Sequence, residues 1–391
     1  MTTRLTPEGF VAHITERPIF YFIIMQKRIQ ELDVLRVLAM FFVITYHFGC
    51  EYAAAGLPFI NLFCTTSNYD FGNIAVTIFI ALSGGLLYKR YGVIGCEERC
   101  PTQPGITNDA QKKKSKFEQI KTFYVKRAKA IYPPFWILSL YIPLSMIRHL
   151  LADGNPFFMG SPFKLSLTVI GFDGYVKLFG ISTYAFCGDW FVGAIVLLYL
   201  LYPLLAKCYR NFPVVTLIVL AGLYASQFLL PAEHDGIMSA LPATLMFKFV
   251  IGFALIENLE RLKDWRVAAV AGVAFAVLTF VDIPGRLNTD AIGTFASFAL
   301  FAILFYLAPQ LLRFKAASVP IQKLATLSYC VFLVQHVGIV WVQGAFVKIF
   351  EKMHWSFTQW NVLALLACTL VIIVLVAWIL KLVSDKLVQK R

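Results

Sequence analysis

The sequence predicts an all-α integral membrane protein with about ten transmembrane helices and both termini in the cytoplasm. Hydrophobic residues make up 59% of the chain, well above the roughly 45–50% of soluble domains. Charged residues make up only 15%, cluster in short segments between long apolar runs, and leave a mean hydropathy of +0.71. A helix needs about 20 apolar residues to cross the hydrocarbon core, and many segments here meet that requirement.

Ten apolar segments are predicted to span the membrane. Residues 1–24 precede them as an N-terminal extension that is either disordered or not native, and residues 25–388 form the predicted transmembrane domain. The predicted spans are residues 34–50, 73–91, 130–148, 188–207, 213–231, 240–257, 266–283, 290–311, 322–347 and 360–384.

The charges of the loops set the predicted orientation. The loop at 89–129 carries eleven Lys and Arg residues against four acidic ones, whereas residues 51–72 carry no Lys or Arg. Because Lys and Arg accumulate in cytoplasmic loops, the 89–129 loop is predicted to be cytoplasmic, and an even number of spans then places both termini there. The same rule accounts for the net charge of +13, so nucleic acid is not expected as a partner.

Two cysteines, Cys96 and Cys100, lie in the predicted cytoplasmic loop as the sequence CEERC. The pair is interpreted as two reduced thiols rather than half of a zinc site, because no second pair of ligands follows at a suitable spacing. No metal site is predicted.

The first span carries ionisable residues, which are costly in lipid and are therefore functional candidates. Asp33 and Arg36 lie near its cytoplasmic end and His47 near the other end. Arg36 and His47 are eleven positions apart, about three helical turns, so they share one face at a separation of about 16 Å. A positive-inside anchor and an interfacial histidine are the structural alternatives. The shared face favours a function, in which the cation holds a phosphate-bearing donor and the imidazole meets a distant hydroxyl.

Further motifs follow in order along the chain. The segment GNIAVTIFIALSGG contains a Leu-Ser-Gly turn at Leu82, Ser83 and Gly84. A basic segment, FYVKRAKAIYPPFW, places Arg127 ahead of a Tyr-Pro. WFVGAIVLLYLLYP then spaces Trp190, Tyr199 and Pro203, and LSYCVFLVQH supplies Ser328, Tyr329 and His336. Together with the Arg36–His47 spacing, these segments resemble the membrane-bound acyltransferase-3 family, which includes bacterial polysaccharide and glycan O-acetyltransferases. The resemblance covers residues 26–386.

The chain departs from the family pattern at two places. Ala130 stands where the basic segment has a second cation, with Lys129 beside it, and Ile195 and Val196 stand where many members carry acidic residues. The first departure affects donor binding, and the second indicates a subset of the family that lacks those carboxylates.

The resemblance implies acyl transfer from a cytoplasmic acyl-CoA, expected to be acetyl-CoA, with no tightly bound cofactor. The acceptor is expected to be a hydroxyl or amine of a cell-surface or lipid-linked glycan. His47 would be the general base, Arg36 would hold the donor, and Arg127 with Lys129 would attract the nucleotide. Membrane lipid, the glycan acceptor and proteins of polysaccharide synthesis or export are the expected partners, in the cytoplasmic membrane.

Other residues are candidates for either a site or a structural role. Asp189 is interpreted first as a helix N-cap, Ser83 as a helix-packing residue beside two glycines, and His336 as either a hydrogen-bonded core histidine or a second site histidine. The full set is Asp33, Ser83, Asp189, Trp190, Tyr199, Ser328, Tyr329 and His336.

Two other classes of protein share the spans and the buried charges. A transporter or flippase would be expected to show inverted repeats, and no duplicated pattern is visible. A non-catalytic partner in polysaccharide export would fit Ala130 and the missing acids, but the retained Arg36 and His47 speak against it.

Overall fold

The computed structural model describes residues 28–58, 61–94, 115–184, 190–230, 232–283 and 289–389; residues 1–24, Cys96, Cys100 and Asp189 lie outside these ranges. Every regular element of the described chain is helical, apart from an isolated bridge between Thr65 and Asp70. The α-helices are α3 (Glu31–Ala54), α4 (Phe71–Tyr91), α5 (Lys116–Ser139), α6 (Tyr141–Asp153), α7 (Leu165–Ile170), α8 (Asp173–Lys177), α9 (Trp190–Asn211), α10 (Pro213–Ser226), α11 (Pro242–Glu257), α12 (Trp265–Phe280), α13 (Thr289–Leu312), α14 (Lys315–Met353) and α15 (Gln359–Gln389). Short 3-10 helices occupy Pro162–Lys164, Gln227–Leu229, Ala232–Ala240 and Arg261–Lys263.

Each predicted span coincides with helical structure, but the helices differ in length. Within the described ranges, seven helical segments are long and apolar enough to cross a membrane: α3, α4, the α5–α6 segment, α9, α13, α14 and α15. The predicted spans at 213–231, 240–257 and 266–283 correspond to the shorter helices α10, α11 and α12. The all-helical membrane fold is therefore confirmed, and the count of ten full-length spans is confirmed only in part.

Helix α5 begins earlier than the sequence predicts. The part of the basic 89–129 loop from Lys116 onward is helical, because the Ser115 side chain accepts a hydrogen bond from the Glu118 backbone N–H and caps the helix. The helix ends at Ser139, where Pro143 of α6 removes a backbone donor and its ring would clash with the carbonyl four residues earlier. The predicted span at 130–148 is thus divided between α5 and α6.

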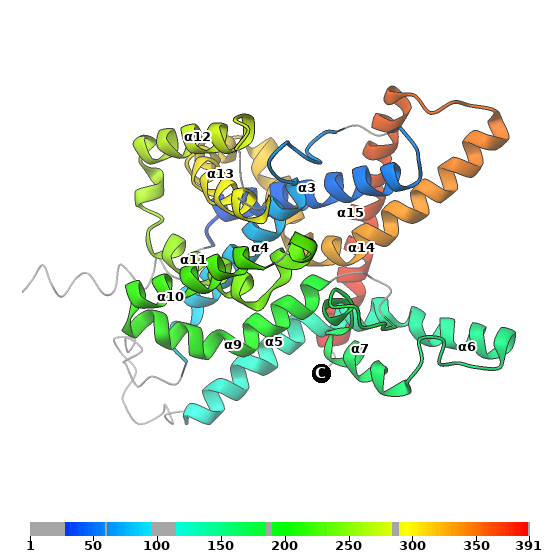
Figure 1. Cartoon of the computed structure of the whole chain (residues 1–391), viewed down its shortest axis with the longest axis horizontal. Helices are drawn as coiled ribbons and strands as arrows, with labels where there is room; N and C mark the ends of the chain where they lie inside the picture. Colours follow the sequence, from blue (N-terminus) through cyan, green and yellow to red (C-terminus); the bar gives the residue numbers. More distant parts are fainter. Residues whose placement is uncertain are drawn as a thin grey trace, which may run out of the picture.

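Helix α4 lies at the centre of the bundle and packs against α3, α11 and α13 (Figure 1). Its closest contact, with α11, depends on glycines. A Cβ added at Gly84 would overlap the Phe249 carbonyl, and one at Gly252 would overlap the Ala81 carbonyl. Small residues let helix backbones approach closely within a membrane, where apolar burial supplies little driving force between helices.

Helices α3 and α14 pack side by side and run in the same direction. Near their starts, Arg28 donates to the Gln322 carbonyl oxygen at 3.1 Å; near the end of α3, Gln343 donates to the Glu51 carbonyl oxygen at 3.1 Å. The C-terminal half of α14 and helix α6 extend to one side of the bundle in Figure 1. Because the two helices are parallel, the segment of α3 from Arg36 to His47 lies alongside the segment of α14 from Ser328 to His336.

Candidate active site

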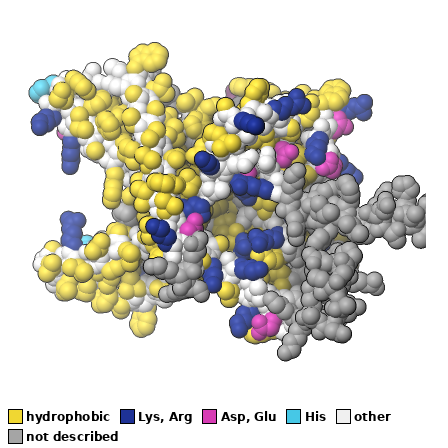
Figure 2. All heavy atoms as spheres, turned by 180° about the vertical axis from the view of Figure 1, so that it is seen from behind, with side chains coloured by type: hydrophobic (Ala, Val, Ile, Leu, Met, Phe, Trp, Pro, Cys, Tyr) yellow, Lys and Arg dark blue, Asp and Glu magenta, His cyan; other side chains and the backbone are white. Residues whose placement is uncertain are grey.

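An interhelical cavity of ≈ 1040 Å³ lies between α3, α4, α5, α9 and α14. Six of the residues singled out from the sequence line it: Arg36, Ser83, Arg127, Tyr199, Ser328 and Tyr329. One end of the cavity is basic, with Arg28, Arg36, Lys89, Arg90 and Arg127. Lys and Arg side chains gather around a hollow in the face shown in Figure 2. A concave site with a single sign of charge concentrates ligands of the opposite sign.

Arg36 is held at this basic end by a buried carboxylate. Asp33 is fully buried, and its two oxygens accept from Arg28 Nε at 2.7 Å and from Arg36 Nη1 at 2.9 Å. Arg36 lines the cavity, and its guanidinium has further N–H groups for which no acceptor is found within the described ranges. Asp33 therefore orients two guanidinium groups, and one net positive charge remains on the trio.

Arg127 enters the cavity from α5. Its Nη2 donates to the Tyr91 hydroxyl at 3.2 Å, and its guanidinium lies 5.5 Å from the Tyr91 ring centroid and 5.9 Å from that of Tyr199. Its buried Nε finds no hydrogen-bond partner among the described residues. Lys129, in contrast, is exposed and lies outside the cavity lining, where Ala130 is present instead.

Hydroxyl groups line the wall of the cavity. Ser83 and Tyr199 share a hydrogen bond of 2.8 Å between α4 and α9. Tyr329 donates to the Ile131 carbonyl oxygen at 3.0 Å, and Ser328 donates to the Ala325 carbonyl oxygen of its own helix at 3.0 Å. The helix-packing role expected near Ser83 belongs to the two glycines that follow it, whereas Ser83 itself faces the cavity.

Three phenylalanine rings close the end of the cavity opposite the arginines. The phenylalanine cluster consists of Phe79 on α4, Phe191 on α9 and Phe332 on α14. The ring centroid of Phe191 lies 4.4 Å from that of Phe332 and 6.3 Å from that of Phe79, and those of Phe79 and Phe332 lie 6.5 Å apart. Among the cavity-lining residues of its own helix, each phenylalanine is the one farthest from the basic end.

His47 lies beyond the phenylalanine cluster and does not line the cavity. Its Nδ1 is 2.9 Å from the Val43 carbonyl oxygen. A carbonyl oxygen only accepts, so we assign the proton to Nδ1, which leaves the lone pair of Nε2 free. A half-buried neutral imidazole with a free Nε2 can accept a proton from a substrate hydroxyl.

His336 stands beside His47 at the same level. The two ring centroids are 5.7 Å apart, edge to face, and His336 Nε2 lies 3.6 Å from a carboxylate oxygen of Glu51. Glu51 is not among the residues that the sequence singles out, although it follows His47 by four positions and so shares its helix face. Trp190 begins α9, half-buried against Phe191 with a centroid distance of 6.3 Å, and lies outside the cavity lining.

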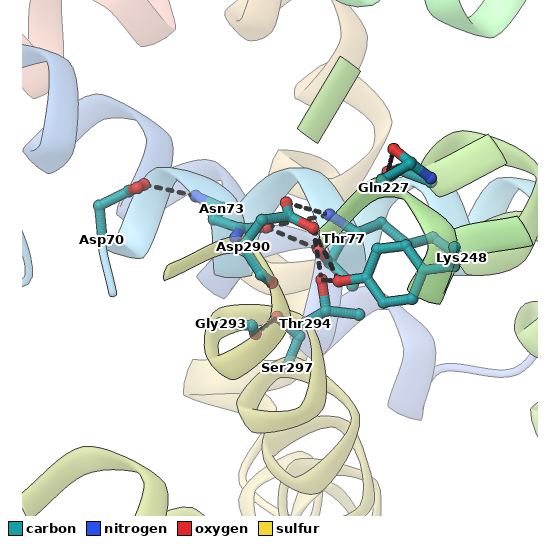
Figure 3. A network of polar contacts seen from close by, with 11 residues as sticks. Asp70, Asn73, Thr77, Gln227, Lys248, Asp290, Gly293, Thr294 and Ser297 are labelled. Atoms are coloured by element: carbon teal, nitrogen blue, oxygen red, sulfur yellow. Dashed lines mark hydrogen bonds and ion pairs between the residues drawn. The ribbon is translucent and has the colours of Figure 1, made fainter. Parts of the chain in front are cut away.

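A second polar cluster lies away from the cavity, among α4, α10, α11 and α13 (Figure 3). Lys248 is fully buried and donates to Asp290 at 2.9 Å and to the Asn73 side chain at 3.1 Å. Tyr224 donates to the other Asp290 oxygen at 2.8 Å, and Thr77 donates to Asn73 at 3.1 Å. We call this set the buried ion-pair network. In the sequence, the network is indicated by Lys248, which stands in the middle of an apolar segment.

No group of three or more His, Cys, Asp or Glu side chains in the described ranges is arranged to hold a metal ion. A family model described as an acyltransferase domain matches residues 29–382. Comparisons with curated proteins and with solved structures gave no match. The family match spans nearly the whole chain, so the protein belongs to the acyltransferase 3 family and is a multi-pass membrane acyltransferase.

Proposed function

We propose that this membrane acyltransferase transfers a short acyl group, with acetyl as the main one, from acyl-CoA to a hydroxyl or amine of a cell-surface or lipid-linked glycan. The observation that carries the proposal is the interhelical cavity, which leads from a cluster of arginines toward His47, with its unprotonated Nε2. The arginines can bind the phosphates of the donor, and the imidazole can take the proton of the acceptor.

The basic end of the cavity suits the donor. Coenzyme A carries phosphates at one end and the thioester at the other, separated by a slender pantetheine arm. Arg36 and Arg127 both line this end, and a guanidinium group offers charge-assisted hydrogen bonds to phosphate oxygens. The Lys and Arg bias of the loops supports a cytoplasmic position for this end, in the cytoplasmic membrane.

His47 supplies the proton transfer. Its Nε2 takes the proton of the acceptor hydroxyl while the oxygen attacks the thioester carbon, so that a C–O bond forms and the C–S bond then breaks. The proton passes from Nε2 to the leaving CoA sulfur, which restores the neutral imidazole. General-base help of this kind contributes typically about 10²–10⁴-fold to the rate. The acyl group reaches the acceptor directly, without a covalent enzyme intermediate.

The buried ion-pair network is the feature that a transporter or flippase would share, because intramembrane charges mark ion pathways in such proteins. Here the charges of Lys248 and Asp290 are paired with each other. An assembly partner without catalysis would not need His47 to keep a free Nε2. Both observations favour the enzyme.

The first test is CoA release from acetyl-CoA by purified protein in detergent, with and without an extract of envelope glycans. We expect release that depends on the extract and falls at least about 100-fold in His47→Ala, while the thermal midpoint stays within a few degrees. Near-normal turnover by His47→Ala would show that another group is the base. No release by folded wild-type protein with any short acyl-CoA would overturn the proposed function.

A further inference from the structure

Gln335, on α14, has an unpaired amide in the interior of the bundle. Its side chain is fully buried, and neither Oε1 nor Nε2 has a hydrogen-bond partner among the described residues. The other two buried glutamines in the described ranges are paired. Gln343, eight positions later on the same helix, donates to the Glu51 carbonyl oxygen, and Gln227 accepts from Thr244 at 2.8 Å.

An unpaired buried amide calls for an explanation. The large majority of buried side-chain polar atoms in proteins have a hydrogen-bond partner, because a buried donor or acceptor without one costs more than a typical hydrogen bond contributes. A leucine or methionine would fill the same space without that cost. An amide that stays unpaired in the described part of the chain is therefore a candidate for pairing with something the protein binds.

Gln335 does not line the cavity, but it lies one turn beyond a residue that does. Ser328, Phe332 and Gln335 are spaced by four and three residues and so share one face of α14. The first two line the interhelical cavity. Gln335 lies one residue before His336, whose ring is 5.7 Å from that of His47. Along α14, Gln335 thus stands about 5 Å beyond the ring that closes the cavity and at the level of the general base.

We propose that Gln335 is a further catalytic residue, which binds the carbonyl oxygen of the acyl thioester and donates a hydrogen bond to the oxyanion of the tetrahedral intermediate. The inference rests on the proposed function. When the acceptor oxygen attacks the carbonyl carbon, the C=O electron pair moves to this oxygen, and the Nε2–H of Gln335 stabilises the charge. When the C=O bond reforms, CoA leaves as the thiolate and takes the proton from His47.

The test uses Gln335→Met, which keeps the length of the side chain and removes the donor, with Gln343→Met as the matched control. For Gln335→Met we expect turnover to fall about 10²–10³-fold with little change in KM for acetyl-CoA, since the bond is made mainly in the transition state. The thermal midpoint should stay equal or rise, because an unpaired amide is removed. Gln343→Met should show the reverse pattern: a lower midpoint from the lost bond to Glu51, with turnover within about threefold of wild type.

Two outcomes would overturn this assignment while the proposed function stands. Wild-type turnover in Gln335→Met would mean that a water molecule satisfies the amide and that it has no catalytic role. A midpoint well below wild type would mean that the amide is paired within the protein. If the wild-type protein itself releases no CoA in the same assay, the proposed function fails, and this inference fails with it.

Discussion

Asp33 explains how two arginines coexist at one end of the cavity. A fully buried carboxylate is costly unless it is paired, and Asp33 pairs both oxygens, one with each guanidinium. Each arginine uses one N–H group for this contact, and Arg28 donates a second to the Gln322 carbonyl oxygen. The sequence places Asp33 and Arg36 on one helix, but Arg28 lies ahead of the start of α3, where no helical pattern predicts the position of its side chain.

Arg127 and Lys129 allow a direct test of the donor site. They are two positions apart on α5, but only Arg127 lines the cavity. We expect Arg127→Ala to raise KM for acetyl-CoA about 10–100-fold, because hydrogen bonds to charged groups contribute about 1.5–3 kcal/mol. Lys129→Ala should leave KM within about twofold. Steady-state CoA release measures both, and equal effects would mean that the bulk charge of the segment binds the donor rather than the cavity.

The sequence predicts the site to the extent that its residues lie within single helices. The eleven-residue spacing of Arg36 and His47 is local, and both residues lie within the single helix α3. Contacts between α3 and α14 are not local. The approach of His336 to Glu51, and the unpaired state of Gln335, depend on the packing of two helices whose contacting residues are nearly 300 positions apart. No spacing rule in one sequence supplies that register.

At the scale of elements, the contact between α4 and α11 fixes one wall of the cavity. Because an added Cβ at Gly252 would overlap the Ala81 carbonyl, we expect Gly252→Ala to destabilise the protein by about 1–3 kcal/mol. Gly272 of α12 meets nothing within 4 Å, so Gly272→Ala should be neutral or stabilising by up to about 1 kcal/mol. Thermal unfolding in detergent compares the two. A neutral Gly252→Ala would mean that α4 and α11 can move apart freely.

If the proposed function is correct, the phenylalanine cluster is expected to limit the length of the acyl group that the site accepts. The centroids of three rings from three helices lie within 6.5 Å of one another, so the rings are in contact at this end of the cavity. We expect Phe332→Ala, or the milder Phe332→Leu, to raise the rate with hexanoyl-CoA relative to acetyl-CoA at least about tenfold, because each methylene accommodated in an apolar pocket is worth about 1–3 kcal/mol. Competition between the two thioesters measures this ratio.

Phe350 provides the control for that experiment. It is buried on the same helix and contacts aromatic rings, but it does not line the cavity. Phe350→Ala should lower stability by a comparable amount without changing the acyl preference. A shift in preference in both variants would indicate general loosening of the bundle instead of a larger acyl pocket.

The helices themselves are mostly predictable, because apolar length is a local property. Their ends are less so. The start of α5 at Lys116 depends on a Ser115 cap within a basic stretch that hydropathy assigns to a loop, and its end depends on Pro143. The sequence predicts full spans at the short helices α10, α11 and α12, because the apolar segments there continue past the ends of the α-helices.

At the scale of the whole molecule, the basic residues and the histidines occupy different levels. The arginines line one end of the cavity, and His47 with His336 lies past the aromatic end. A donor entering from the arginine side and an acceptor arriving at the histidines would therefore meet near the phenylalanine cluster. The loop charges predict that the arginine end faces the cytoplasm.

The buried ion-pair network joins α4, which lines the cavity, to α10, α11 and α13, which do not. If the network serves to hold these helices together, stability requires that the two charges be either both present or both absent. Lys248→Met should cost about 3–5 kcal/mol, since it leaves Asp290 buried without its cation. The double variant Lys248→Met/Asp290→Asn removes both charges while Asn can still accept from Tyr224. It should recover most of the stability and keep near wild-type CoA release.

A charge-translocating role predicts a different outcome for the same variants. The double variant would fold, because no buried charge is left unpaired, but activity would be lost with the moving charge. Thermal unfolding and CoA release, measured together on the single and double variants, separate the two roles. The pairing of Lys248 with both Asp290 and Asn73 argues for the role of holding the helices together: a cation held by two acceptors from different helices resists the movement that transport requires.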